Sequence, residues 1–206
     1  CLSPMNQPKA YSALPKQVVR PRFPAAVARD VAEFLCRVLA PACSRIIIAG
    51  NLRRQRPMVG DVEIIYVQRT EMVVDQSDLF GWELEAELAD DVIAGLEARC
   101  ELGRRLNANG SQMFGAKNKL MVHLPSGIPV DLFTATEECW WNYLVCRTGG
   151  AENNVAICNA AQARGEKWNP YGPGFTRNNG IKTAMTSEEH VFRFVGLPYL
   201  PPEARP

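Results

Sequence analysis

The sequence predicts an α+β fold: a mixed sheet with helices on one side, followed by a small, mainly helical unit. Two observations lead to this prediction. The first part of the chain alternates helix-like and strand-like patterns in the order helix, strand, strand, helix, strand, strand, whereas the later part contains helical patterns separated by Gly- and Pro-rich turns. The 206 residues, of which 47% are hydrophobic and 22% charged, suffice for one sizeable core or for a domain with a smaller satellite.

The elements of the first part follow from hydrophobic periodicity and turn residues. Residues 24–40 place apolar side chains at helical spacing, with Arg29, Glu33 and Arg37 on the opposite side. Residues 82–100 are expected to form a second helix with an acidic exposed face. Strands are expected where short apolar runs lie between turn residues: 45–50, 62–67, 119–124 and 128–133. The last two are joined by Pro-Ser-Gly, a plausible hairpin turn.

The character of the sequence changes near Glu137, where we expect a boundary between subdomains. Residues 137–145 and 152–164 have helical patterns and are separated by Arg-Thr-Gly-Gly. The stretch Thr186-Ser187-Glu188-Glu189 reads as a capping box at the start of a short helix that ends at Gly196.

Composition favours an intracellular protein. No apolar run reaches the roughly 18 residues of a membrane span, and the first 17 residues lack the apolar core of a secretion signal. The seven cysteines include no C-x-x-C and are interpreted as reduced thiols, several of them buried. We therefore expect a cytoplasmic protein that makes no membrane contact. The net charge of +1 hides basic blocks before Asp30 and between Arg104 and Val130, and such blocks are either solvated faces or a track for a polyanion.

Three carboxylates are the candidate metal ligands. In a strand, residues i and i+2 point to the same face, so Asp61 and Glu63 project together, and Asp131 also points away from the core between Val130 and Leu132. If the two strands are neighbours, three carboxylates converge, which is unfavourable unless a cation joins them. Hard oxygen ligands suit Mg²⁺ or Mn²⁺, and two ions about 4 Å apart could serve an in-line phosphoryl transfer.

The stretch Gly50-Asn51-Leu52-Arg53-Arg54 follows the first expected strand. A glycine at this turn lets backbone N–H groups approach a phosphate, and the arginines supply positive charge. A phosphate site beside metal-held oxygens is what phosphoryl transfer requires. The alternative is an exposed strand face whose carboxylates pair with the nearby arginines, and the co-occurrence of Gly-x-x-Arg-Arg, Asp-x-Glu and Asp131 favours the catalytic interpretation.

With these motifs in view, the sequence resembles the family X DNA polymerases, typified by DNA polymerase beta. The motifs are "GNLRR", "GDVEI" and "VDLF", then "RTGGAENNVAICNAAQARGEKWNPYGPGF", and finally "SEEHVFRFVGLPYLPPEARP". The match covers about Pro24 to Pro206. It implies an N-terminal arm at 1–22, a palm (nucleotidyltransferase) domain at 23–136 and a thumb subdomain at 137–206, a minimal palm-plus-thumb form.

The resemblance implies a reaction and a set of functional residues. The reaction is template-directed addition of dNMP from dNTP to a primer 3′-OH with two Mg²⁺ ions, for which Mn²⁺ may substitute, during short-gap repair. The catalytic and metal-binding residues are Asp61, Glu63 and Asp131. The nucleotide-binding residues are Gly50, Asn51, Arg54, Gly60, Thr148, Gly149 and Asn154. The DNA-binding residues are Lys117, Lys119, Arg147, Lys167 and Tyr171, although Tyr171 is equally well explained as part of the Asn-Pro-Tyr-Gly turn.

The sequence departs from the family pattern at several of these positions. Asn51 stands where Ser is usual, Glu63 where Asp is usual, Cys146-Arg147 replaces an aromatic pair, and Pro170 replaces Glu. We expect a monomer that acts on gapped or primed DNA, binds it weakly and in a salt-sensitive way, and relies on separate repair proteins for lyase or ligase activity. The alternatives are a template-independent or non-DNA nucleotidyltransferase of the same fold and a non-catalytic nucleic-acid-binding relic.

Overall fold

The computed structural model describes residues 21–74 and 83–206. The N-terminal arm expected at residues 1–22 lies outside the described residues except for its last two. In the part of the chain that the structure describes, no helix is both long and apolar enough to span a membrane.

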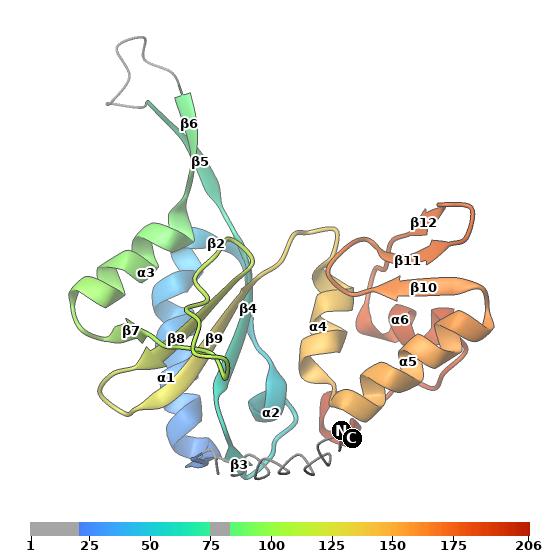
Figure 1. Cartoon of the computed structure of the whole chain (residues 1–206), viewed down its shortest axis with the longest axis horizontal. Coiled ribbons are helices and arrows are strands. Elements are labelled where there is room, and N and C mark those ends of the chain that lie inside the picture. Colours follow the sequence, from blue (N-terminus) through green and yellow to red (C-terminus); the bar gives the residue numbers. More distant parts are fainter. Residues whose placement is uncertain (1–20, 75–82) are drawn as a thin grey trace, which may run out of the picture.

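A five-stranded mixed sheet forms the centre of the first part of the chain (Figure 1). Its strands, in spatial order, are β2 (Cys43–Ile48), β4 (Val62–Gln68), β9 (Ile128–Thr134), β8 (Asn118–His123) and β7 (Leu102–Arg104). β4 and β9 run parallel, and the other neighbours are antiparallel. The four predicted strands are therefore confirmed, and the two that carry the candidate carboxylates are adjacent.

The two faces of the sheet pack against different helices. On one face, Ile64, Tyr66, Val130 and Leu132 join the main core with α1 (Ala25–Leu39) and α3 (Leu88–Ala98). Alternate strand residues, Ile65 and Phe133 among them, join a second cluster with α4 (Trp140–Thr148). Because side chains alternate along a strand, Glu63 and Asp131 lie on the face that α4 partly covers.

The predicted helix at 82–100 is wrong in its first part. Residues Glu83–Glu87 form strand β6, which pairs with β5 (Thr70–Val74) in a two-stranded ribbon, and helix α3 begins only at Leu88. The ribbon extends away from the sheet (Figure 1). Glu, Leu and Ala are good helix formers, so pairing with β5 has overridden local propensity here.

Two short elements flank the Gly50 stretch. Residues Gly50–Arg53, expected as a turn, form the single-turn helix α2. Strand β1 (Phe23–Pro24) pairs with β3 (Met58–Val59) just before the Asp61 stretch. Both were too short to show a periodic signal in the sequence.

The C-terminal part combines helices with a small sheet. Helix α4 is followed by α5 (Ala151–Ala163), and later by α6 (Glu188–Phe194) and a 3₁₀ turn at Pro202–Ala204. Between α5 and α6, three antiparallel strands form a sheet: β10 (Glu166–Asn169), β11 (Gly174–Arg177) and β12 (Lys182–Thr183). This sheet was not predicted, because its strands are short and interrupted by Asn, Pro and Gly.

Helix α4 links the two hydrophobic cores on either side of it. Leu144 packs in the cluster against the large sheet, and Val145 packs with Ile157 of α5 in the core of the C-terminal part. Trp141 contacts both clusters, as expected for a residue at an interface between subdomains. Movement of one part relative to the other would therefore change the packing of α4.

The start of α6 differs by one residue from the predicted capping box. Ser187 is the N-cap, and its hydroxyl accepts a hydrogen bond from the backbone N–H of His190 at 3.0 Å. Position N3 is therefore His190 rather than a glutamate. Its ring nitrogen Nδ1 accepts from the backbone N–H of Thr186 at 3.3 Å, so the side chain at N3 reaches back to the residue before the N-cap rather than to the N-cap itself.

A buried ion-pair network joins the two parts of the chain. The guanidinium of Arg53 on α2 donates two hydrogen bonds to the carboxylate of Glu188 on α6, at 2.8 and 2.6 Å. Arg205, whose side chain is fully buried, donates to the same carboxylate at 2.8 Å. Burial alone would raise the pKa of Glu188, but the bonds and charges of Arg53 and Arg205 hold it below its usual range.

We predict that Glu188→Gln lowers the free energy of unfolding by roughly 3 kcal/mol at pH 7, because it leaves two buried guanidiniums without their shared anion. Because the pKa of Glu188 is lowered in the folded protein, the stability it adds is present at neutral pH and is lost as the pH falls through that pKa. Urea denaturation at pH 7 and at acidic pH measures both effects. The matched control is Glu189→Gln, an exposed neighbour on the same helix. Equal loss in the two variants would contradict the prediction.

Candidate active site

The candidate carboxylates lie together because β4 and β9 are in register. Glu63 is the direct partner of Asp131 across the parallel pair, and Asp61 comes immediately before β4. The charges of Asp61 and Asp131 both act on Glu63, and that of Asp61 acts on Asp131. The structure thus brings all three predicted residues together at two neighbouring interior strands of the sheet.

The Glu63 side chain is packed against the backbone of Gly50. Gly50 has a φ of +59°, and a Cβ at this position would collide with the Glu63 carboxylate. The pKa of Glu63 is raised to about 8, first by burial and then by the charges of Asp61 and Asp131, while Arg147 and Arg54 oppose the shift. Glycine at position 50 is therefore required both by the local backbone and by the position of a candidate ligand.

Asp131 has a resident cationic partner. Nη2 of Arg105 donates a short hydrogen bond to Oδ1 of Asp131, and the Asp131 side chain is only 15% exposed. Burial raises the pKa of Asp131, whereas the charge and hydrogen bond of Arg105 act in the opposite direction. Arg105 lies just after β7, and its Nε donates to the carbonyl of Met121 at 3.1 Å.

The chemistry of these donors fits a hard divalent cation, although this side-chain arrangement does not present them to one. Asp61 raises the pKa of both Glu63 and Asp131, and three carboxylates so close together are a favourable environment for Mg²⁺ or Mn²⁺. Among the described residues, no group of three or more His, Cys, Asp or Glu is arranged to hold a metal ion. Glu63 is turned toward Gly50 and Asp131 toward Arg105, so metal binding requires these two side chains to reorient.

Two of the residues predicted to bind the nucleotide, Asn51 and Gly60, line a cavity of about 600 Å³ beside this site, whereas Gly50 and Arg54 do not. Asp61, Arg22 and Arg105 also line it. Arg54 points elsewhere: it donates to the side-chain oxygen of Asn51 at 2.7 Å and to the backbone oxygen of Pro206 at 2.8 Å. The N–H of Gly150 donates to the same Pro206 oxygen at 3.0 Å, so Arg54 contributes to the contact between the two parts of the chain.

The predicted nucleotide-binding residues of the C-terminal part lie at the junction of α4 and α5. Thr148 is buried, and its hydroxyl accepts a hydrogen bond from Arg53 at 2.8 Å. Gly149 follows it as the C-cap of α4. The amide of Asn154 donates to the carbonyl of Cys146 at 2.9 Å. The contacts of Thr148 and Asn154 fix the ends of these helices against α2 and against each other.

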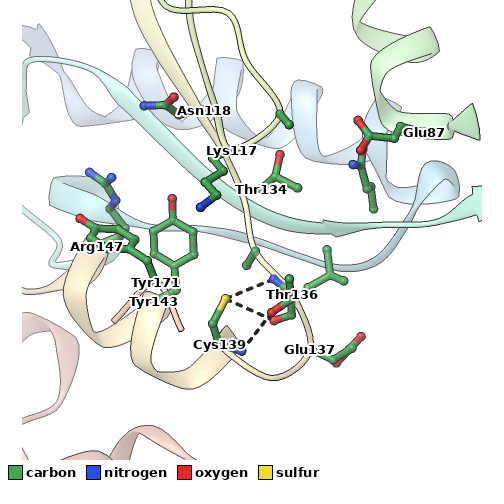
Figure 2. Close-up of a pocket in the computed structure, with 14 residues that line it drawn as sticks. Glu87, Lys117, Asn118, Thr134, Thr136, Glu137, Cys139, Tyr143, Arg147 and Tyr171 are labelled. Carbon is green, nitrogen blue, oxygen red and sulfur yellow. Dashed lines mark hydrogen bonds between the residues drawn. The ribbon is translucent and has the colours of Figure 1, made fainter. Parts of the chain in front are cut away.

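A second cavity of about 600 Å³ lies between the large sheet and the C-terminal part (Figure 2). It is lined by Lys117, Tyr143, Arg147 and Tyr171, three of which were predicted to bind DNA. The guanidinium of Arg147 lies 3.8 Å from the centre of the Phe133 ring and about 5.5 Å from those of Tyr143 and Tyr171. Its Nε is buried without a hydrogen-bond partner. A cation held mainly by aromatic faces is available to an anionic ligand.

The other two predicted DNA-binding residues lie away from this cavity. Lys119 is almost completely buried on the α3 side of the sheet, where its ammonium pairs with Asp90 at 2.8 Å. Its placement supports a structural role rather than contact with DNA. Lys167 is exposed on β10.

Sequence reasoning did not single out Arg22 and Arg105. Each belongs to one of the basic blocks, so composition contained a signal, but several arginines compete in each block. Only the pairing of β7 with β8 places Arg105 rather than Arg104 next to Asp131.

Comparisons with known proteins agree with this fold. Residues 143–206 match the DNA polymerase beta thumb family. The chain is 26% identical over 205 residues to DNA polymerase/3'-5' exonuclease PolX of Bacillus subtilis (strain 168), a match covering 97% of this chain and 31% of that protein. It therefore spans less than a third of the length of that relative. A solved ternary P/T complex of Leishmania infantum polymerase beta superimposes with a TM-score of 0.68 at 19% identity, covering 91% of this chain and 78% of that one.

These observations define a polymerase-like protein with a nucleotidyltransferase palm and a thumb. More closely, the resemblance to the family X DNA polymerases of the DNA polymerase beta type is confirmed, with the thumb recognised at the C-terminus and a distant relative matched over nearly the whole chain.

We predict that Gly50→Ala destabilises the protein by about 1–3 kcal/mol, because alanine disfavours a φ of +59° and its Cβ displaces the Glu63 carboxylate. Guanidinium denaturation measures the change. Gly115→Ala is the control, since a Cβ there meets no atom within 4 Å. If both variants were as stable as the parent, the packing of Glu63 under Gly50 would be wrong.

Proposed function

We propose that this protein is a DNA-directed DNA polymerase of the family X type that fills short gaps. The observation that carries the proposal is the in-register pairing of Glu63 with Asp131, next to Asp61, beside a cavity with phosphate-binding character. The relatives support it: one is named as a DNA polymerase, and the other was solved as a ternary P/T complex.

The proposed reaction joins the primer 3′-oxygen to the α-phosphorus of a dNTP and releases pyrophosphate. Asp61, Glu63 and Asp131 would hold two divalent cations, which supply charge neutralisation at the reacting phosphate. Asp131 is also the candidate to accept or orient the 3′-hydroxyl proton. The oxygen that accepts from Arg105 is a poor proton acceptor, so Asp131 would use its other oxygen or separate from Arg105 first.

The nucleotide would lie between the two parts of the chain. Asn51 and Gly60 line the cavity where the β- and γ-phosphates would bind, and Arg22 and Arg105 add positive charge there. Arg54 would reach these phosphates by giving up its bond to Pro206. Thr148 and Gly149 would lie against the sugar, and Asn154 would approach the base. Release of these contacts on nucleotide binding is the kind of rearrangement that closes an active site.

DNA would follow the cationic and aromatic wall of the second cavity. Lys117 and Arg147 offer charge to backbone phosphates, and Tyr171 offers an exposed ring. With a net charge of +1, we propose weak binding that falls as salt is raised. We further propose that the protein acts as a monomer and that separate repair proteins supply lyase or ligase activity.

We predict that the protein extends a primer across a one-nucleotide gap with only the complementary dNTP, in Mg²⁺ or Mn²⁺. Asp131→Asn should lower this activity by at least roughly a thousandfold, because the metal and proton roles of the carboxylate are both lost. Asp91→Asn, an exposed change on α3, is the matched control. Each dNTP and rNTP is tested separately on gapped DNA.

The outcomes distinguish the alternatives. Extension with any nucleotide would favour a template-independent transferase. Activity on RNA ends or small acceptors alone would favour a non-DNA nucleotidyltransferase. No transfer with either metal, together with no metal-dependent nucleotide binding, would rule out the enzyme and favour a nucleic-acid-binding relic.

A further inference from the structure

Arg105 connects the carboxylate site with the phosphate cavity. Its guanidinium contacts Asp131 and lines the cavity that Asn51 and Asp61 also line. Three hydrogen bonds hold the residue: Nη2 to Asp131, Nε to the carbonyl of Met121 at 3.1 Å, and the backbone N–H to the carbonyl of Leu120 at 3.0 Å. The cation is therefore built into the β8–β9 surface rather than resting on it.

The local charge balance explains why a cation is needed at this point. The charges of Asp61 and Asp131 act on Glu63, that of Asp61 acts on Asp131, and Asp131 is only 15% exposed. Like charges on directly paired strand residues are unfavourable without a counter-ion. Arg105, itself 27% exposed, supplies one positive charge to a carboxylate oxygen. Arg147 adds charge from α4, but its guanidinium rests on the rings of Phe133, Tyr143 and Tyr171.

A divalent cation at the same carboxylates would meet Arg105 directly. It would either take the Asp131 oxygen that Arg105 holds or approach the other oxygen of the same carboxylate. In the first case the two cations exclude each other, and in the second they repel across a few ångströms in a half-buried site. In both cases the free energy of metal binding is reduced by the presence of the guanidinium.

We propose that Arg105 is the resident counter-cation of the carboxylate site and competes with divalent metal for Asp131. It stabilises the metal-free fold and weakens metal binding, so it sets the metal concentration at which the site becomes loaded. Arg105 is thus a positioning residue acting through Asp131. The inference rests on the proposed function, since it assumes that these carboxylates bind metal.

The test is a titration of the protein with Mn²⁺ in the absence of nucleotide and DNA. The signal is the electron paramagnetic resonance of free Mn²⁺, which falls as Mn²⁺ binds. Arg105→Gln is expected to bind Mn²⁺ roughly tenfold more tightly than the parent, whereas Arg105→Lys, which keeps the charge, stays close to it. Arg104→Gln is the matched control, because it removes the neighbouring arginine. Arg104 pairs with Glu97, at an Nε–Oε1 distance of 2.7 Å, and does not contact the carboxylate site. In an Asp131→Asn background, the effect of Arg105→Gln should vanish.

Thermal unfolding gives a second readout that does not depend on activity. Metal-free Arg105→Gln should melt at a lower temperature than the metal-free parent. Mn²⁺ should raise the melting temperature of the variant by more than it raises that of the parent. If the parent binds Mn²⁺ and Arg105→Gln binds it equally or more weakly, competition is wrong while the proposed function stands. If neither the parent nor any variant binds Mn²⁺, even when dNTP is added, the proposed function fails and this inference fails with it.

Discussion

The parallel pairing of β4 with β9 is the constraint on which the rest of this structure depends. It fixes Glu63 opposite Asp131, and strand alternation then forces both carboxylates onto the face that packs against α4. A shift of one residue would turn the carboxylates into the hydrophobic core, so the buried neighbours on both strands hold the register. The cost of placing two acids together is therefore imposed by the backbone, and the surrounding residues must offset it.

Residues from distant parts of the chain accommodate these carboxylates. Gly50, after β2, leaves room for the Glu63 carboxylate, and Arg105, after β7, binds Asp131. Arg147 on α4 adds a third influence, since its charge acts on both carboxylates while aromatic rings support its guanidinium. Rotation of the Glu63 and Asp131 side chains would end their contacts with Gly50 and Arg105. Under the proposed function, this rotation would precede metal binding.

The sequence predicted four strands of the large sheet, helix α1, the helices of the C-terminal part and the three carboxylates, because each depends on local periodicity or on a short motif. It did not predict strand β6, whose residues favour a helix until β5 pairs with them. It assigned Arg53 and Arg54 to phosphate as a pair, whereas Arg53 holds Glu188 and Arg54 holds the backbone at Pro206. Contacts over more than 100 residues, such as those of Arg53 and Arg54, leave no local signal. Arg105 could not be distinguished from Arg104 because only the pairing of β7 with β8 decides which of the two lies beside Asp131.

The stretch that follows β2 joins the two parts of the chain, and under the proposed function some of the same side chains would also bind phosphate. Arg53, Arg54 and Arg56 bind Glu188, Pro206 and the carbonyl of Arg205, and so join α2 to the C-terminal part. The ion pair of Arg53 is the most buried of the three and is the least able to exchange. Arg54 donates to an oxygen of Pro206 in an exposed contact, and a phosphate offers charge-assisted hydrogen bonds to the same guanidinium. Under the proposed function, Arg53 would hold the two parts of the chain together through Glu188, while Arg54 would exchange its contact with Pro206 for a bound triphosphate.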